Sequence, residues 1–183
     1  MIYTSEVNEK GAAMQVAGLM SAAARTAPKS CGIDAVETLV LDGEDKDKLT
    51  AFMREIGTQD GKAYFIRDAG NIDACHCIVL IGVNTDPRGF SSPWSVNCGL
   101  CGIGNCVEFS EIGAPCVMAV TDLGIAVGSA ASTAMDHRID NRIMYTAGMA
   151  AVGLRLFPDN VKICFGIGLA TKGKNVFFDR PAG

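Results

Sequence analysis

Hydrophobic and polar residues follow one another along the chain in two kinds of block, which predict helices and strands. Apolar residues at helical spacing among many alanines predict a helix over 5–27, ended by Pro28. A second helix is predicted over 45–57, with acidic residues at its start and a glycine at its end. Strands are predicted over 36–43 and 73–83. The second is a continuous apolar run, typical of a central strand buried on both faces.

The pattern changes in the second half of the chain. Residues 84–116 are dense in Gly, Pro, Ser and Asn, as expected of an insert rather than of a regular element. A helix is predicted over 121–140 with small residues nearly all round, so it must be enclosed by its own core or by a partner subunit. A strand over 141–147, a helix over 148–157 and a strand over 161–170 complete the pattern.

This alternation of helices and apolar strands predicts an α/β fold in a layered α+β arrangement. The chain has 183 residues and 49% of them are hydrophobic, enough to bury a substantial core in one compact unit. We therefore expect a single domain over 1–183, with 84–116 as a cysteine-rich insert.

Charge and targeting signals narrow the function classes. The formal charge is −4 and the pI about 5.1, which argues against a nucleic-acid partner because such a partner needs a basic face. Acidic residues precede the apolar part of the N-terminus, unlike in a signal peptide. The apolar stretch 123–135 is too short and too rich in Gly and Ser to span a bilayer. We expect a cytoplasmic protein with neither a nucleic-acid nor a membrane partner.

Cysteine is the residue type that carries candidate chemistry. The chain has eight cysteines and no export signal, so reduced thiols that bind a metal or do redox chemistry are favoured over a disulfide framework. Four of them follow the spacing Cys98-x2-Cys101-x4-Cys106-x9-Cys116. The C-x2-C pair turns two thiolates toward one centre, and nearby glycines let backbone amides approach the sulfur atoms. An iron–sulfur cluster, with 4Fe–4S as the preferred type, suits this uneven, glycine-rich spacing.

Three other interpretations of these cysteines stay open. A structural zinc site with four thiolates is one, although zinc more often uses two separated C-x2-C pairs. A redox dithiol and free buried thiols are the others. A second metal candidate is Cys75, His76 and Cys77, but alternation along a strand places the two thiols on one face and the imidazole on the other. Core packing is therefore favoured for these three residues.

The segment "NCGLCGIGNCVEFSEIGAPC" resembles the four-cysteine cluster-binding module of corrinoid-activating and electron-transfer proteins. Over nearly its whole length the chain resembles the uncharacterised ferredoxin-domain proteins of anaerobic bacteria and archaea. The stretches that carry this resemblance are "AARTAPKSCGIDAVE", "CGLCGIGNC", "DLGIAVGSAAS", "DNRIMYTAG" and "GKNVFFDR". The resemblance brings no established reaction with it.

A more distant resemblance is to the nitroreductase-like flavoproteins, on "AARTAPKSCGIDAVETLVLDGEDKDKLTAFM" and "TDLGIAVGSAASTA". It implies a nitroreductase-like mixed sheet with flanking helices, a homodimer with the small-residue helix at its interface, and an FMN pocket between the subunits. The Arg-Arg-Ser signature of those proteins is absent, and Gly32 and Asp34 stand where they carry Asn and Gln. The residues that the resemblance places at the flavin are Lys29, Ser30, Gly32, Asp34, Lys172 and Lys174.

The leading hypothesis is therefore an iron–sulfur redox or electron-transfer protein with a redox partner that the sequence does not identify. Its enzymatic form is an FMN-dependent oxidoreductase, in which the cofactor carries the chemistry and no catalytic side chain is assigned. The alternatives are a non-enzymatic metal-binding sensor and a zinc-stabilised structural protein.

Overall fold

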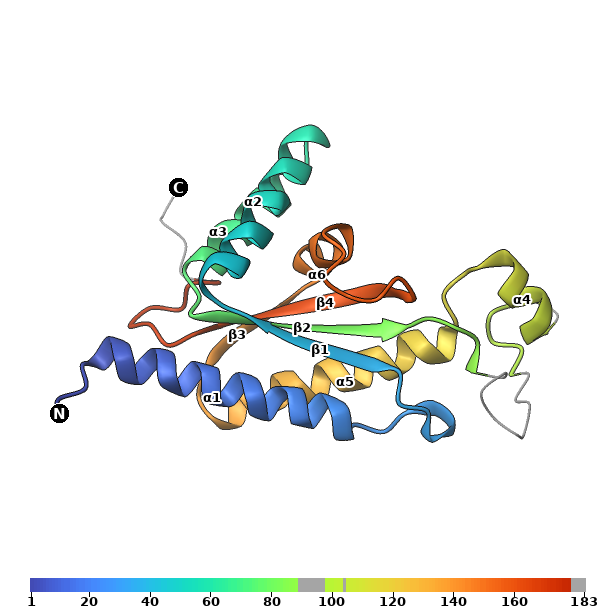
Figure 1. Cartoon of the computed structure of the whole chain (residues 1–183), viewed down its shortest axis with the longest axis horizontal. Coiled ribbons are helices and arrows are strands. Elements are labelled where there is room, and N and C mark those ends of the chain that lie inside the picture. The colour runs from blue at the N-terminus through green and yellow to red at the C-terminus, as the bar shows by residue number, and fades with distance from the viewer. Residues whose placement is uncertain (89–97, 104, 179–183) are drawn as a thin grey trace.

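A computed structural model of the chain describes residues 1–88, 98–103 and 105–178. Its helices lie on both sides of a four-stranded sheet (Figure 1). In chain order the elements are α1 (Ser5–Thr26), the short 3-10 helix η1 (Ser30–Gly32), β1 (Val36–Leu41), α2 (Gly43–Gln59), α3 (Ala63–Asp73), β2 (Cys77–Asn84), α4 (Cys106–Ile112), α5 (Val117–Asp136), β3 (Asp140–Met144), α6 (Tyr145–Gly153) and β4 (Val161–Ala170).

The sheet has the strand order β1-β2-β4-β3, and the α/β class is confirmed. All three neighbouring pairs of described strands are antiparallel, where a mixed sheet was expected. The connections explain the direction of the first pair. Helices α2 and α3 lead away from the sheet and back, so β2 starts beside the end of β1, with Leu41 opposite Ile78.

Two hydrophobic layers cover the two faces of the sheet. Helices α1 and α5 pack on one face, and α2, α3 and α6 on the other (Figure 1). Along β2, Cys77, Val79 and Ile81 join the first layer, whereas Ile78 and Leu80 join the second. Every residue of β2 before Asn84 is buried, which confirms the predicted central strand with two covered faces.

The predicted placement of the first cysteine pair was wrong, because the strand starts later than expected. Cys75 and His76 lie in the link between α3 and β2, and β2 begins at Cys77. Cys75 packs in the layer under α2, α3 and α6, and Cys77 in the layer under α1 and α5. Core packing is confirmed for both thiols, and burial raises the pKa of each to about 12. His76 lies with its Nε2 2.8 Å from the hydroxyl of Thr171.

The helices differ from the sequence prediction in three main places. Helix α5 (Val117–Asp136) begins and ends four residues earlier than the predicted 121–140. Helix α3 was not predicted, although Phe65, Ala69 and Ile72 form its buried face. Helix α6 begins at Tyr145, directly after β3, and not at residue 148. By contrast, α1 and β4 agree with the prediction to within a residue.

Helix α5 lies against α1 and beneath the sheet. The helix is long and apolar enough to cross a bilayer, as many core helices of soluble proteins also are. Among the residues that the structure describes, it is the only helix of this kind. This chain encloses only one side of the helix. On the other side the side chains of Val120, Ile125 and Met135 are exposed. Gly124 and Gly128 are exposed there too, with open space where a β-carbon would lie.

Candidate functional site

The candidate site lies where the insert 84–116 leaves the sheet and returns to it. The insert starts at the end of β2 and ends at the first turn of α5, at the end of the molecule opposite the N-terminus (Figure 1). Residues 89–97 and 104 of the insert lie outside the described residues. All four predicted cluster ligands, Cys98, Cys101, Cys106 and Cys116, are described.

Two glycines shape the loop that holds the first two cysteines. Gly99 and Gly102 have φ angles of +66° and +73°, which favour a residue without a β-carbon. The amide of Gly102 donates to the carbonyl of Gly99 at 3.1 Å, closing a tight turn. This turn accounts for the pattern C-G-x-C-G, because each cysteine precedes a glycine with left-handed backbone.

The third cysteine is placed by a capped helix. The side-chain oxygen of Asn105 accepts from the amides of Val107 and Glu108 at 2.9 and 3.0 Å, and its amide group donates to the Glu108 carboxylate at 2.8 Å. This reciprocal cap fixes the start of α4. Cys106, the first residue of α4, is therefore held in a defined position.

The fourth cysteine belongs to the scaffold. Cys116 precedes the first residue of α5, and its amide donates to the carbonyl of Thr85 at 3.0 Å. Its own carbonyl accepts from the amide of Val120 at 3.0 Å, the first hydrogen bond of the helix. The two ends of the insert are thereby joined at Thr85 and Cys116.

The structure brings the four predicted ligands together around two adjoining cavities. The first is lined by Pro87, Cys98, Gly99, Cys101, Cys106, Phe109, Cys116 and Val117. The second is lined by Ser30, Cys31, Arg88, Cys98, Cys106, Cys116 and Met118. Carbon and sulfur atoms make up nearly all of both linings, and neither contains a carboxylate or an imidazole. Such linings suit soft thiolate ligation rather than a hard, oxygen-bound cation.

A single zinc ion and a 4Fe–4S cluster require different distances between the four thiolate sulfur atoms. Four thiolates around one tetrahedral zinc ion stand about 3.8 Å from one another, because each Zn–S bond is about 2.3 Å long. Within the described segments, no three side chains of His, Cys, Asp or Glu are close enough to hold a single ion. In a 4Fe–4S cluster each thiolate binds a different iron, so the sulfur atoms stand farther apart. The described side chains thus supply an all-thiolate set, the ligand type of an iron–sulfur cluster, and in this arrangement they do not surround a single ion.

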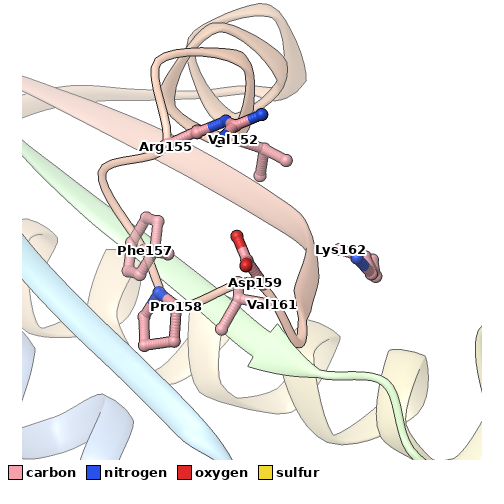
Figure 2. Close-up of a pocket in the computed structure, with 7 residues that line it drawn as sticks. All are labelled: Val152, Arg155, Phe157, Pro158, Asp159, Val161 and Lys162. Carbon is pink, nitrogen blue, oxygen red and sulfur yellow. The ribbon is translucent and has the colours of Figure 1, made fainter.

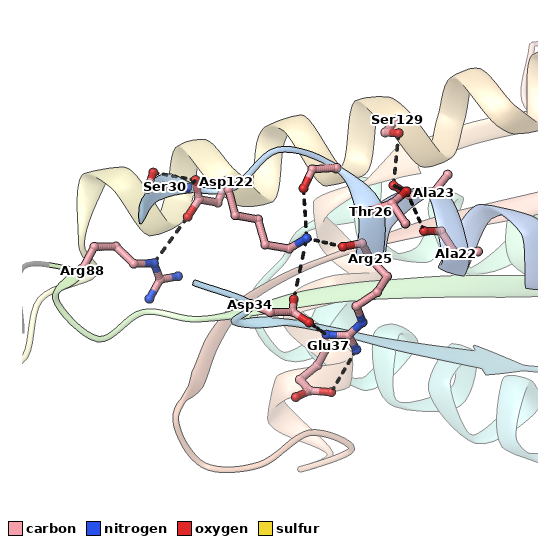
Figure 3. Close-up of polar contacts among 12 residues, drawn as sticks. Ala22, Ala23, Arg25, Thr26, Ser30, Asp34, Glu37, Arg88, Asp122 and Ser129 are labelled. Carbon is pink, nitrogen blue, oxygen red and sulfur yellow. Dashed lines mark hydrogen bonds and ion pairs between the residues drawn. The ribbon is translucent and has the colours of Figure 1, made fainter. Parts of the chain in front are cut away.

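A buried ion pair lies at the base of the site (Figure 3). Nε of Arg88 donates to one carboxylate oxygen of Asp122 at 3.3 Å, and both residues are at most 4% exposed. The other oxygen of Asp122 accepts from the amide and the hydroxyl of Ser30, at 2.8 and 2.7 Å. The remaining guanidinium nitrogens of Arg88 donate to the carbonyls of Asp86 and Asn84. These contacts bind the η1 loop, the start of the insert and α5 to one another.

In the loop that the flavoprotein resemblance places at the flavin, the charged side chains already bind neighbouring groups of this chain (Figure 3). The ammonium of Lys29 donates to the carbonyls of Ala27, at 3.0 Å, and of Arg25, and lies 3.7 Å from the Asp34 carboxylate. Partial burial opposes the charge of Asp34, but the 2.8 Å hydrogen bond to Arg25 and the positive charges of Arg25 and Lys29 together outweigh it and lower the pKa of the carboxyl. Gly32 has a φ of +66°.

The two lysines assigned to the same flavin lie at the other end of the sheet. Lys172 and Lys174 follow the end of β4, beside the start of β2, and both are exposed. Burial, together with the charge of Lys172, lowers the pKa of His76 nearby. Since β2 spans eight residues, about 25 Å separate this end from the η1 loop. One chain therefore does not bring the two sets of predicted flavin residues together.

Sequence reasoning missed Cys31, Arg88 and Asp122 as residues of the site. Their separation along the chain gives no spacing pattern. A signal did exist for Asp122, because a carboxylate flanked by small and apolar residues near the start of a mostly apolar helix needs a polar partner when it is buried. Cys31 had no comparable signal.

A further pocket lies away from the cysteines, at the turn between α6 and β4 (Figure 2). Val152, Phe157 and Pro158 supply its apolar wall, and Arg155 and Asp159 supply charge. It shares no lining residue with the two cysteine cavities. These two side chains and that of Lys162, the third charged residue of the lining, are exposed, so the lining lacks a buried charged group that would select a ligand.

Similar structures define the class of fold. A nitroreductase with bound FMN from Desulfitobacterium hafniense matches 95% of this chain and 81% of its own, with a TM-score of 0.56 and 15% identity. The nitroreductase CinD from Lactococcus lactis, in complex with nicotinic acid, matches 100% of this chain and 83% of its own, with a TM-score of 0.60 and 12% identity. This chain therefore has the nitroreductase fold.

Similar sequences define the family. Residues 112–180 match the family described as "Uncharacterized protein containing a ferredoxin domain (DUF2148)". An uncharacterized protein of Archaeoglobus fulgidus is 37% identical over 185 residues, which cover 96% of each chain. The chain belongs to this family of ferredoxin-domain proteins. The family match begins after Cys106, so Cys116 is the only predicted ligand inside it.

Proposed function

We propose that this chain is an iron–sulfur redox protein that holds a 4Fe–4S cluster with Cys98, Cys101, Cys106 and Cys116. One observation carries the proposal: these four thiols, from a loop, a short helix and the start of α5, line the same cavity. The family description and the nitroreductase fold support a redox role. When bound, such a cluster accepts and donates single electrons.

The surrounding residues serve this role in three ways. The rigid turn at Gly99 and the capped start of α4 hold the thiols in place before a cluster binds, which lowers the ordering cost of binding. The carbon-rich lining, including Phe109, excludes water and so helps to set the potential. Arg88, which lines the second cavity, is bound to Asp122 and so holds the start of the insert beside α5.

A variant series tests the proposal. Cys98→Ser, Cys101→Ser and Cys106→Ser each remove one thiol of the site, and Cys164→Ala removes a buried thiol of the other core layer as the matched control. After reconstitution with iron and sulfide under anaerobic conditions, we expect the control to show the broad visible absorption of an iron–sulfur cluster. Each of the three serine variants should lose most of it. Equal absorption in all four variants would contradict the ligand assignment.

FMN is the second cofactor that we propose, in an oxidoreductase built from two copies of the chain. Ser30, from the loop that the flavoprotein resemblance singles out, lines the second cysteine cavity, so a flavin there would adjoin the cluster. Lys29 is engaged by carbonyl oxygens, which leaves the phosphate to Lys172 and Lys174, and these must come from the second copy. Lys172→Ala combined with Lys174→Ala should weaken FMN binding in a fluorescence titration, whereas the exposed Lys48→Ala should not.

A homodimer follows from the same proposal. The outer side of α5 carries exposed Val120 and Ile125 beside Gly124 and Gly128, and no atom lies within 4 Å of a β-carbon placed on either glycine. Small residues of this kind let a second helix approach closely. The face continues from the end of the helix that carries Cys116, and the proposal requires that a second copy docked there brings its Lys172 and Lys174 toward the η1 loop of the first copy.

A further inference from the structure

A fifth cysteine, outside the insert, borders the cluster site. Cys31 lines the second cavity together with Cys98, Cys106 and Cys116. These last three cysteines also line the first cavity, which Cys101 completes. The three shared thiols thus have Cys101 on one side and Cys31 on the other.

The backbone at Cys31 is unusual for a residue with a side chain. Its φ and ψ are 57° and 15°, in the left-handed region where a β-carbon crowds the backbone. Glycine is the ordinary residue there, and the chain does place a glycine at the next position, Gly32, whose φ is +66°. Cys31 therefore carries a side chain at a position where the backbone conformation favours glycine. Strained positions of this kind are typical of functional sites.

The loop that carries Cys31 is fixed to the scaffold at Ser30 and is closed by its own backbone hydrogen bonds. Before it, the amide and hydroxyl of Ser30 donate to the buried carboxylate of Asp122. Around it, the amides of Gly32 and Ile33 donate to the carbonyls of Lys29 and Ser30, both at 3.1 Å. The Cys31 thiol is consequently held beside the cavity rather than swinging freely on a long loop.

The five thiols divide into two groups by origin. Cys98, Cys101 and Cys106 lie within the insert, whereas the two scaffold thiols are Cys31, inside η1, and Cys116, the last residue of the insert, which directly precedes α5. A 4Fe–4S cluster takes four thiolates, one on each iron. Cys31 and Cys116 both line the second cavity, so the site offers five thiols for four positions.

We propose that Cys31 is an alternative ligand for the fourth iron and can take the place of Cys116. This inference rests on the proposed function, because it requires the cluster. In the exchange the Cys31 thiol releases its proton to water and its sulfur forms the new bond to iron. The Cys116 sulfur leaves that iron and takes up a proton, so no iron changes its oxidation state. The site therefore retains its cluster when either scaffold thiol is lost.

The test compares single and double variants purified and reconstituted without oxygen, with iron and acid-labile sulfide measured per chain. Cys116→Ser and Cys31→Ser should each keep nearly the wild-type content, because the other thiol completes the site. The double variant should fall to about three quarters of the wild-type iron or less. Cys116→Ser combined with Cys164→Ala, which removes an unrelated buried thiol, should match Cys116→Ser alone.

Loss of the fold is controlled by a second substitution. Cys31→Gly removes the same thiol but suits the left-handed backbone, so its thermal unfolding temperature should not fall. Combined with Cys116→Ser it should lose iron as the serine double variant does. In iron-free protein, mild oxidation with diamide should join Cys31 to Cys98, Cys106 or Cys116, as mapped by peptide mass spectrometry.

The outcomes separate the two proposals. A wild-type protein that binds neither iron nor sulfide overturns the proposed function. A loaded wild-type protein overturns the Cys31 inference alone if Cys116→Ser already loses the cluster, or if the double variant keeps as much iron as Cys116→Ser. Failure of Cys31 to form any disulfide with the three shared cysteines would also overturn it.

Discussion

The carboxylate of Asp122 holds Ser30 by two hydrogen bonds, from the amide at 2.8 Å and from the hydroxyl at 2.7 Å. Its second oxygen pairs with Arg88, which lies in the first part of the insert. One buried side chain on α5 thus fixes the loop beside Cys31 and the start of the segment that carries the other thiols. The cysteines can converge because the η1 loop, the start of the insert and α5 are joined through Asp122.

Asp122→Asn tests this support. The amide keeps a similar shape but leaves the buried guanidinium of Arg88 without its counter-charge, so we expect a loss of about 2–4 kcal/mol in the free energy of unfolding. Urea denaturation measures it. Asp136→Asn, at the exposed end of the same helix, is the matched control and should change the free energy by less than about 0.5 kcal/mol. Equal urea midpoints for the two variants would refute the structural role of the pair.

Thiol reactivity should follow burial. Burial raises the pKa of Cys75, Cys77 and Cys164 to about 12, so in the folded, iron-free protein at pH 8 these thiols stay protonated and react slowly. Cys31 and Cys98 are exposed and should react first with iodoacetamide. Time-resolved peptide mass spectrometry measures the order, and labelling of Cys164 as fast as Cys98 would contradict it.

The same three buried thiols predict a dependence of stability on pH. In the unfolded chain a thiol ionises near its ordinary pKa of about 8.5 to 9, below the pKa of about 12 in the fold. The unfolded state therefore releases these protons first, and the free energy of unfolding should fall as the pH rises from about 9 toward about 12. Urea titrations of wild type and Cys164→Ala measure it. The variant should show the shallower decline, and identical declines would count against the buried thiol.

Gly148 tests the packing of α6 on β4. A β-carbon at this position would overlap the carbonyl group of Cys164, which is backbone and cannot turn aside. We expect Gly148→Ala to lower the free energy of unfolding by about 3 kcal/mol or more. Gly18→Ala, on an exposed helical surface with no atom within 4 Å, should instead gain about 0.5–1 kcal/mol. A Gly148→Ala protein as stable as wild type would show that this packing is wrong.

Association is tested by two isoleucines of equal exposure. Ile125 on α5 and Ile66 on α3 are both 43% exposed but lie on opposite sides of the sheet. If two chains meet through α5, Ile125→Glu should give monomers in sedimentation velocity because it buries an unpaired charge at the interface. Ile66→Glu should leave the dimer intact. A wild-type monomer, or equal effects of both variants, would contradict the proposed interface.

The sequence was informative where chemistry or periodicity was local. Strand β4 was predicted with its observed limits, because ten residues with alternating and then continuous apolar character lie between Pro158 and a polar turn. The metal candidates were likewise found from the spacing of Cys98, Cys101 and Cys106, three thiols within one short segment. Their convergence with Cys116 was an extrapolation that the cavity supports.

Features that depend on distant contacts could not be predicted. Helix α3 was missed because its three buried apolar residues, Phe65, Ala69 and Ile72, form too short a periodic pattern to stand out beside charged neighbours. The place of Cys31 depends on the hydrogen bonds between Ser30 and Asp122, which only the packing of α5 against the η1 loop creates. Strand β2 begins at Cys77 and not at residue 73 as predicted, because α3 extends as far as Asp73.

The central claim is that four sulfur atoms of this chain hold one 4Fe–4S cluster. Iron, zinc and acid-labile sulfide per chain, measured on wild-type protein purified entirely without oxygen, test it most directly. The account predicts about four iron and about four sulfide per chain, with no zinc. One zinc per chain without sulfide, or folded protein free of metal after reconstitution, would contradict it.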